Sequence, residues 1–99
     1  MRLVYVAGKY RGKNENEVYE NINLARSHAH KLWQRGYAVI CPHLNTMFMG
    51  DGNEEKYLGG DKVLLSACDY IYLLPNWKKS KGAREEARLA NKWNIPTLK

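Results

Sequence analysis

The segment DYIYLLPNWKKSKGAREEARLA, residues 69–90, carries the clearest structural signal in the chain. Residues 69–75 are rich in aliphatic and aromatic side chains, which predicts a buried β-strand. Residues 76–83 form a basic loop, and Ala83 at its end lies at helical spacing with Ala87 and Ala90, which predicts a helix after the loop. A strand, a short loop and a helix in this order make up most of a βαβ unit.

Strand and helix signals alternate along the rest of the chain. Residues 2–8 and 37–42 predict two further strands, and residues 95–99 begin a fourth. Between residues 15 and 36, apolar side chains recur at helical spacing and Gly36 ends the run; these are Val18, Ile22, Ala25, Ala29 and Leu32. Residues 43–57 predict a long loop, and the stretch 54–67 contains a less regular helix.

This alternation indicates an α/β fold in which helices cover both faces of a parallel sheet. We expect residues 1–99 to form one flavodoxin-like or Rossmann-like domain of three layers. The first and third strands are the most continuously apolar and should be central, and right-handed crossovers then predict the strand order 2-1-3-4. Ligands bind such sheets beyond the carboxyl ends of the strands, where the order reverses, here between the first and third strands.

Composition narrows the classes of function. The net charge of +6 favours phosphorylated or polyanionic partners, although a merely basic surface would have the same total. The chain has no apolar run long enough to span a membrane and no signal peptide, so we expect a cytoplasmic protein. Cys41 and Cys68 lie in apolar stretches, which predicts reduced core thiols. The chain has no CxxC or HExxH pattern, so the sequence does not predict a zinc site.

Two basic loops should meet at the point where the strand order reverses. Residues 8–14 follow the first strand and residues 76–83 follow the third, and both loops contain glycine and lead into helices. Helix N-termini and exposed backbone N–H groups bind anions, so the two loops predict a phosphate pocket. Two solvated basic loops would have the same composition, and neither loop carries a common nucleotide-binding glycine motif.

Glu86 is the first candidate for chemistry. It lies beside the small-residue stripe of its helix, where a carboxylate is desolvated unless it faces a pocket. The helix dipole favours acids in the first turn, but this structural explanation suits Glu85 better. Asp61 is the second candidate, near the predicted start of the second helix, where an N-cap role is the alternative.

Tyr5 and His43 are further candidates at the same edge of the sheet. Tyr5 lies near the end of the first strand, where packing in the core would also explain it, and His43 directly follows the second strand. Trp77 could stack on a ligand ring or belong to the core. Two carboxylates, a tyrosine and an anion pocket suggest glycosyl chemistry, in which one carboxylate attacks or stabilises an oxocarbenium-like carbon and another acid protonates the leaving group.

In this order and spacing, the residues resemble the nucleoside 2-deoxyribosyltransferase-like superfamily, and most of all its 2′-deoxynucleoside 5′-phosphate N-hydrolases and small phage and bacterial relatives. The matching segments are VYVAGKYRG, the PH pair at 42–43, GGDKVLLSACD and SKGAREEARLA. The resemblance implies cleavage of the N-glycosidic bond of a 2′-deoxynucleoside 5′-monophosphate, by hydrolysis or base transfer. It implies neither a metal nor an organic cofactor.

The resemblance also implies roles for single residues. Glu86 matches the catalytic glutamate, Asp61 an acid that assists the departing base or orients the sugar, and Tyr5 a tyrosine that positions the glutamate or the ribose. The remaining candidates for binding the substrate or its phosphate are Gly8, Arg11, Gly12, His43, Ser80 and Gly82. At the position of Ser80, the transferases tend to carry an aspartate, whereas the monophosphate hydrolases carry a serine that contacts phosphate. The resemblance therefore implies a phosphorylated substrate.

The expected partner is therefore a small nucleotide or nucleoside. The main alternative is a non-catalytic module of the same fold that binds a nucleotide as a signal. Nucleic-acid binding is disfavoured because the basic residues concentrate in the two loops, and it would show steep salt dependence. Small size and the resemblance together predict a homodimer or a higher homo-oligomer.

Overall fold

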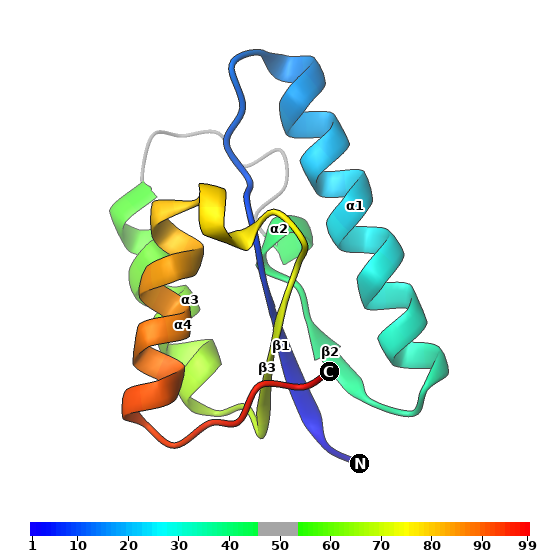
Figure 1. The fold of residues 1–99 in the computed structure, drawn as a ribbon, viewed down its shortest axis with the longest axis vertical. Coiled ribbons are helices and arrows are strands. Elements are labelled where there is room, and N and C mark those ends of the chain that lie inside the picture. The colour runs from blue at the N-terminus through cyan, green and yellow to red at the C-terminus, as the bar shows by residue number, and fades with distance from the viewer. Residues whose placement is uncertain (46–53) are drawn as a thin grey trace.

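The computed structural model describes residues 1–45 and 54–99, apart from the side chains of residues 54 and 55. These residues contain three strands, β1 (Leu3–Ala7), β2 (Ala38–Ile40) and β3 (Tyr70–Leu73), in a parallel sheet of order β2-β1-β3 (Figure 1). The helices are α1 (Glu15–Gln34), α2 (Pro42–Asn45), α3 (Glu54–Ser66) and α4 (Lys81–Lys92), with a short 3-10 helix, η1 (Trp77–Lys79), before α4. The predicted α/β class and the order 2-1-3 are confirmed.

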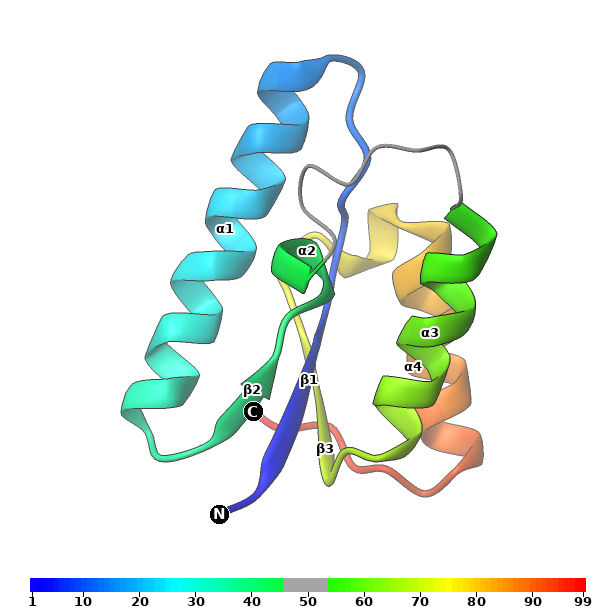
Figure 2. The same cartoon turned by 180° about the vertical axis from the view of Figure 1, so that it is seen from behind.

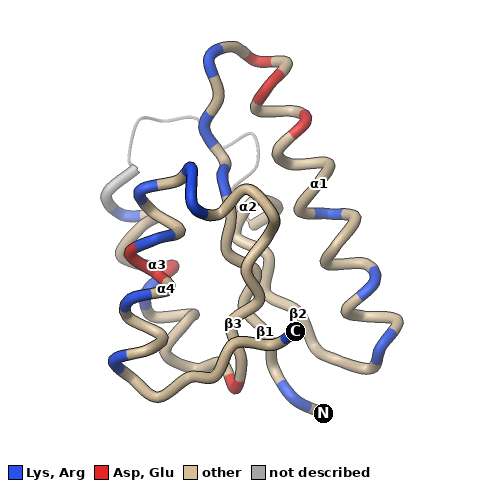
Figure 3. The backbone as a smooth tube through the Cα atoms, viewed as in Figure 1, with Lys and Arg blue, Asp and Glu red and all other residues tan. Residues whose placement is uncertain are grey.

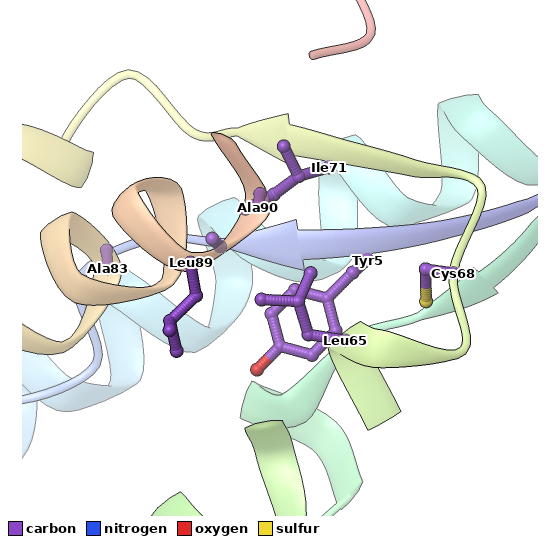
Figure 4. Packing of buried hydrophobic residues seen from close by; sticks show 8 residues of the cluster. Tyr5, Leu65, Cys68, Ile71, Ala83, Leu89 and Ala90 are labelled. Carbon is purple, nitrogen blue, oxygen red and sulfur yellow. The ribbon is translucent and has the colours of Figure 1, made fainter. Parts of the chain in front are cut away.

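Helices cover both faces of the sheet. Helix α1 packs on one face, and α3 and α4 lie side by side on the other (Figures 1 and 2). The side chains of β1 alternate between these layers, so that Val4 and Val6 belong to the cluster with α1, and Tyr5 to the cluster with α3 and α4. Figure 4 shows the Tyr5 ring beside Leu65 in this second cluster. Burial on both sides explains why β1 is a continuous apolar run.

The predicted fourth strand is not formed. Residues 95–99 contribute one isolated parallel bridge, from Thr97 to Ile71 of β3. Asn94 adopts a left-handed conformation with φ of 58°, and the amide of Ile95 still donates to the carbonyl of Ala90 in α4. The end of α4 therefore uses the chain up to residue 95, and only the next few residues run beside β3.

The predicted loop over residues 43–57 is largely helical where it is described. Pro42 begins α2, as is typical of proline in a first turn, and Glu54 begins α3. Residues 46–53 of this loop lie outside the described residues. Because α3 begins at Glu54, Asp61 lies about two turns inside the helix, and the expectation that it sits near the helix start is wrong.

The predictions for the apolar face of α1 and for the two cysteines agree with the structure. In α1 the predicted apolar residues are buried, with Val18 half-buried, and Asn14 caps the helix by accepting the amide hydrogen of Glu17 at 2.9 Å. Cys41 and Cys68 are buried free thiols, as predicted. Across the described ranges, no helix is both long and apolar enough to cross a membrane.

Candidate functional site

A pocket of about 540 Å³ opens at the carboxyl end of the sheet. This volume is within the range of ~300–1,000 Å³ that is usual for small-molecule sites. Its wall combines the loop after β1, the start of α2, part of α3, and the segment from η1 into α4. The two basic loops thus share one pocket, and seven of the nine predicted site residues line it: Gly8, Arg11, His43, Asp61, Ser80, Gly82 and Glu86.

Tyr5 contacts the pocket through Glu86. The Tyr5 hydroxyl donates a hydrogen bond to Oε2 of Glu86. Tyr5 is fully buried on β1, whereas Glu86 is half-buried in the second turn of α4, on the face that carries the buried Ala83 and Ala90. A carboxylate can occupy this packed face because it meets a hydroxyl on one side and the pocket on the other.

Burial raises the pKa values of Tyr5, Asp61 and Glu86. Desolvation raises the pKa of Glu86 to about 7, the hydrogen bond from Tyr5 lowers it, and the charge of Asp61 raises it. Desolvation raises the pKa of Asp61 to about 6. Desolvation, together with the charges of Glu86 and Asp61, raises the pKa of Tyr5 far above its usual value, so Tyr5 stays a neutral donor. The two carboxyl groups therefore titrate near neutral pH, as an acid–base pair requires.

The start of α4 forms the part of the pocket best suited to an anion. Ser80 is the N-cap, and its Oγ accepts the amide hydrogen of Ala83 at 3.1 Å. A Cβ added at Gly82 would meet only the Oγ of Ser80, at 3.8 Å, so this turn faces open space. Lys79 and Lys81 also line the pocket here. A helix N-terminus, a hydroxyl and two ammonium groups match the requirements of a phosphate.

The glycines of the loop after β1 permit close packing. A Cβ at Gly8 would lie 2.4 Å from Cδ1 of Leu74, and a Cβ at Gly12 would lie 2.3 Å from the Cβ of Glu17. Gly8 still lines the pocket. Gly12 does not, and the structure places it against α1, where it lets the loop approach the helix.

His43 supports the same loop. It is 5% exposed, and its Nε2 lies 3.0 Å from the carbonyl oxygen of Lys9. A carbonyl only accepts hydrogen bonds, so Nε2 carries the hydrogen. Burial lowers the pKa of His43, and its Nδ1 has no hydrogen-bond partner among the described residues. The ring of Tyr10 lies edge-on to His43, with 5.8 Å between the ring centroids.

Sequence reasoning missed several residues of the wall. Tyr10, Tyr57 and Leu58 add aromatic and apolar surface to it. No motif marks these residues, because Tyr57 and Leu58 depend on which face of α3 meets the pocket, and Tyr10 depends on the path of the loop after β1. Trp77, considered as a ligand-stacking residue, is half-buried against the cluster around Tyr5 and is not part of the wall.

Charge is distributed unevenly around this end of the sheet. Figure 3 shows Lys and Arg along the loop after β1 and along the segment that leads into α4. Both segments contribute to the pocket. Among the described side chains, no three of His, Cys, Asp or Glu gather as ligands for a metal ion. The groups in the pocket wall that could contact a ligand include cationic side chains, backbone amides and two carboxyl groups.

Comparison with known protein families gives a match over almost the whole chain. A family model described as "Domain of unknown function (DUF4406)" matches residues 2–98. The matched range includes every residue of the pocket wall. No curated protein matches the chain.

Proposed function

The chain belongs to the DUF4406 family, and from its pocket we propose that it cleaves the N-glycosidic bond of a 2′-deoxynucleoside 5′-monophosphate. The observation that carries this proposal is the hydrogen bond from buried Tyr5 to Glu86 in a pocket that also holds a helix N-terminus suited to phosphate. The choice of deoxyribose and of a monophosphate comes from the resemblance to the 2′-deoxynucleoside 5′-phosphate N-hydrolases.

The spacing along α4 supports this assignment. Gly82 and Glu86 are four residues apart, which corresponds to about 6 Å along a helix axis. In a nucleoside 5′-phosphate, one methylene and one oxygen separate the sugar ring from the phosphorus. A phosphate bound at Gly82 would therefore bring the sugar close to Glu86. Tyr10 and Tyr57, which line the same pocket, offer aromatic surface for the base.

In the proposed reaction, the bond between C1′ and the base nitrogen breaks, and its electron pair moves to the nitrogen. The carboxylate of Glu86 attacks or stabilises C1′, while protonated Asp61 donates a proton to the departing base or orients the sugar. The Tyr5 hydrogen bond favours the ionised form of Glu86, but the pKa of Glu86, about 7, lies above the value of about 6 for Asp61. The reaction therefore proceeds from the form of the pair in which the single proton lies on Asp61. If a glycosyl ester forms on Glu86, water then gives hydrolysis and an acceptor base gives transfer.

The phosphate would be bound by groups from both loops. Ser80 and Gly82 supply the hydroxyl and the helix amides, and Gly8 and Arg11 approach from the loop after β1. We place this activity in the cytoplasm, in a homodimer or a higher homo-oligomer. The oligomer is proposed from the small size of the chain and from the resemblance.

The test is release of free base, followed by chromatography. Purified protein is incubated with each of the four deoxynucleoside monophosphates and with the matching nucleosides, with and without an acceptor base. We expect release of free base by the wild type and by the control variant Glu85→Gln. In the wild type, the carboxylate of Glu85 pairs with Arg88 outside the pocket. Glu86→Gln should release none.

Two other results would change the assignment. Mononucleotide binding without base release from any substrate would replace the enzyme by the nucleotide-binding module. Equal release by wild type and Glu86→Gln would remove Glu86 from the reaction and refute the mechanism.

A further inference from the structure

The peptide groups of Lys9, in the pocket wall, are held from two sides. Oδ1 of Asn76, which follows β3, accepts the amide hydrogen of Lys9 at 3.0 Å. Nε2 of His43 lies 3.0 Å from the carbonyl oxygen of Lys9 and donates to it. Side chains from two other parts of the fold therefore fix the orientation of the Lys9 backbone in the pocket wall.

The next two residues of the loop are held by α1. Nδ2 of Asn21 donates to the carbonyl of Tyr10 at 3.2 Å and to the carbonyl of Arg11 at 3.1 Å. Asn21 also accepts a hydrogen bond from Nδ2 of Asn76, at 3.5 Å. The two amides thus connect the segment after β3 to the loop after β1 and to α1, which lie 67 and 55 positions earlier in the sequence at the contacting residues.

Backbone groups dictate the orientation of both amides. A backbone N–H only donates, so the atom of Asn76 that faces Lys9 is its oxygen. A carbonyl only accepts, so the atom of Asn21 that faces the loop is its nitrogen. The two remaining atoms then face each other as donor and acceptor. Asn76 acts on the loop as an acceptor, and Asn21 acts on it as a donor.

We propose that Asn21 and Asn76 are positioning residues that hold residues 8–11 in the shape that binds the anionic part of the ligand. Neither residue lines the pocket, and each acts through backbone groups of residues that do. The ligand-binding part of this inference rests on the proposed phosphate site. The effect on loop conformation does not.

Asparagine-to-aspartate substitutions give a matched test, because they keep the shape and the oxygen but remove the amide N–H donors. Asn76→Asp keeps the acceptor for the Lys9 amide, whereas Asn21→Asp places a carboxylate against two carbonyls. Asn23→Asp is the control for added charge, since Asn23 is exposed on α1 and accepts a hydrogen bond from Arg26 that an aspartate preserves. Asn76→Leu removes the acceptor altogether.

The first readout is hydrogen exchange at the Lys9 amide, measured by NMR on variants whose Tm shows that they fold. Exchange should accelerate about tenfold in Asn76→Leu, which loses the acceptor of the Lys9 amide hydrogen. It should accelerate by a similar factor in Asn21→Asp, which loses two hydrogen bonds to the loop and places a carboxylate against its carbonyls. It should stay within about threefold of the Asn23→Asp control in Asn76→Asp. Equal exchange in all four variants, or an Asn76→Asp variant as fast as Asn21→Asp, would overturn the inference.

The second readout is the Kd for inorganic phosphate and for a deoxynucleoside, measured by calorimetry. We expect Asn21→Asp to weaken phosphate binding about tenfold relative to Asn23→Asp, with nucleoside binding within about threefold of that control. An equal loss for both ligands would overturn the positioning role. If the wild type binds no phosphate, the proposed phosphate site fails, and the exchange experiment alone decides the conformational role.

Discussion

Replacing Gly82 by alanine should raise stability and weaken ligand binding at the same time. The added Cβ would meet only the Oγ of Ser80, at 3.8 Å, so the folded protein accommodates it without strain. Alanine is favoured over glycine in a helix by up to about 1 kcal/mol, and Gly82 lies in the first turn of α4. We expect a gain of about 0.5–1 kcal/mol in the free energy of unfolding, which in a domain of this size raises Tm by about 2–8 °C.

Binding should change in the opposite direction. The new methyl group would lie in the open space before the first amides of α4, where the proposed phosphate sits. A steric conflict that costs about 1.4 kcal/mol would weaken the binding of 5′-monophosphates about tenfold. The affinity for the matching nucleosides should not change, since they lack the phosphate.

Calorimetric titration with a monophosphate and its nucleoside, together with a thermal melt, measures both effects. Gly59→Ala is the matched control, because Gly59 lies in α3 outside the pocket wall and a Cβ there would meet nothing within 4 Å. It should share the gain in stability and leave both affinities unchanged. A stabilised Gly82→Ala variant with wild-type affinity for monophosphates would refute the placement of the phosphate at the start of α4.

Three further predictions concern Tyr5, Glu86 and Gly8. In Tyr5→Phe the pKa of Glu86 should rise, because the lost hydrogen bond favoured the carboxylate; the acid limb of the pH–rate profile would then move to higher pH, and an unmoved limb would contradict this role. The folded protein holds a proton on Glu86 between pH 4.5 and about 7 that the unfolded chain releases, so stability should fall by up to about 3 kcal/mol as pH rises through this window. Urea unfolding of Glu86→Gln should show a smaller fall, whereas an identical pH dependence would rule out Glu86 as its source. Gly8→Ala should lose about 1–3 kcal/mol in urea unfolding, since its Cβ would lie 2.4 Å from Leu74; wild-type stability would show that Leu74 can move aside.

Glu86 both packs on the buried face of α4 and reaches the pocket. Its place on the packed face of α4 desolvates the carboxyl group and raises its pKa to about 7. Tyr5 supplies a hydrogen bond that compensates part of this cost, and the pocket gives the carboxyl access to a ligand. A carboxylate on the exposed face of the same helix, such as Glu85, has its pKa lowered by Arg88 instead.

Much of the fold follows from patterns within a few residues of each other. The periodic apolar residues of α1 and the continuous apolar run of β1 each reflect burial on one or two faces, so both elements could be predicted. Parallel topology places the loops after β1 and β3 at the same edge of the sheet. For this reason, the sequence predicts that Gly8 and Arg11 share one pocket with Ser80 and Gly82.

Long-range packing determined the rest. Tyr5 and Glu86 are 81 positions apart, and only the docking of α4 on β1 makes them hydrogen-bond partners. The early start of α3, with Gly59 inside the helix, and the reduction of residues 95–99 to one bridge both run against local signals. The contact of Asn76 with the loop likewise has no sequence motif, because its hydrogen bond with Lys9 joins residues 67 positions apart that only the tertiary fold brings together.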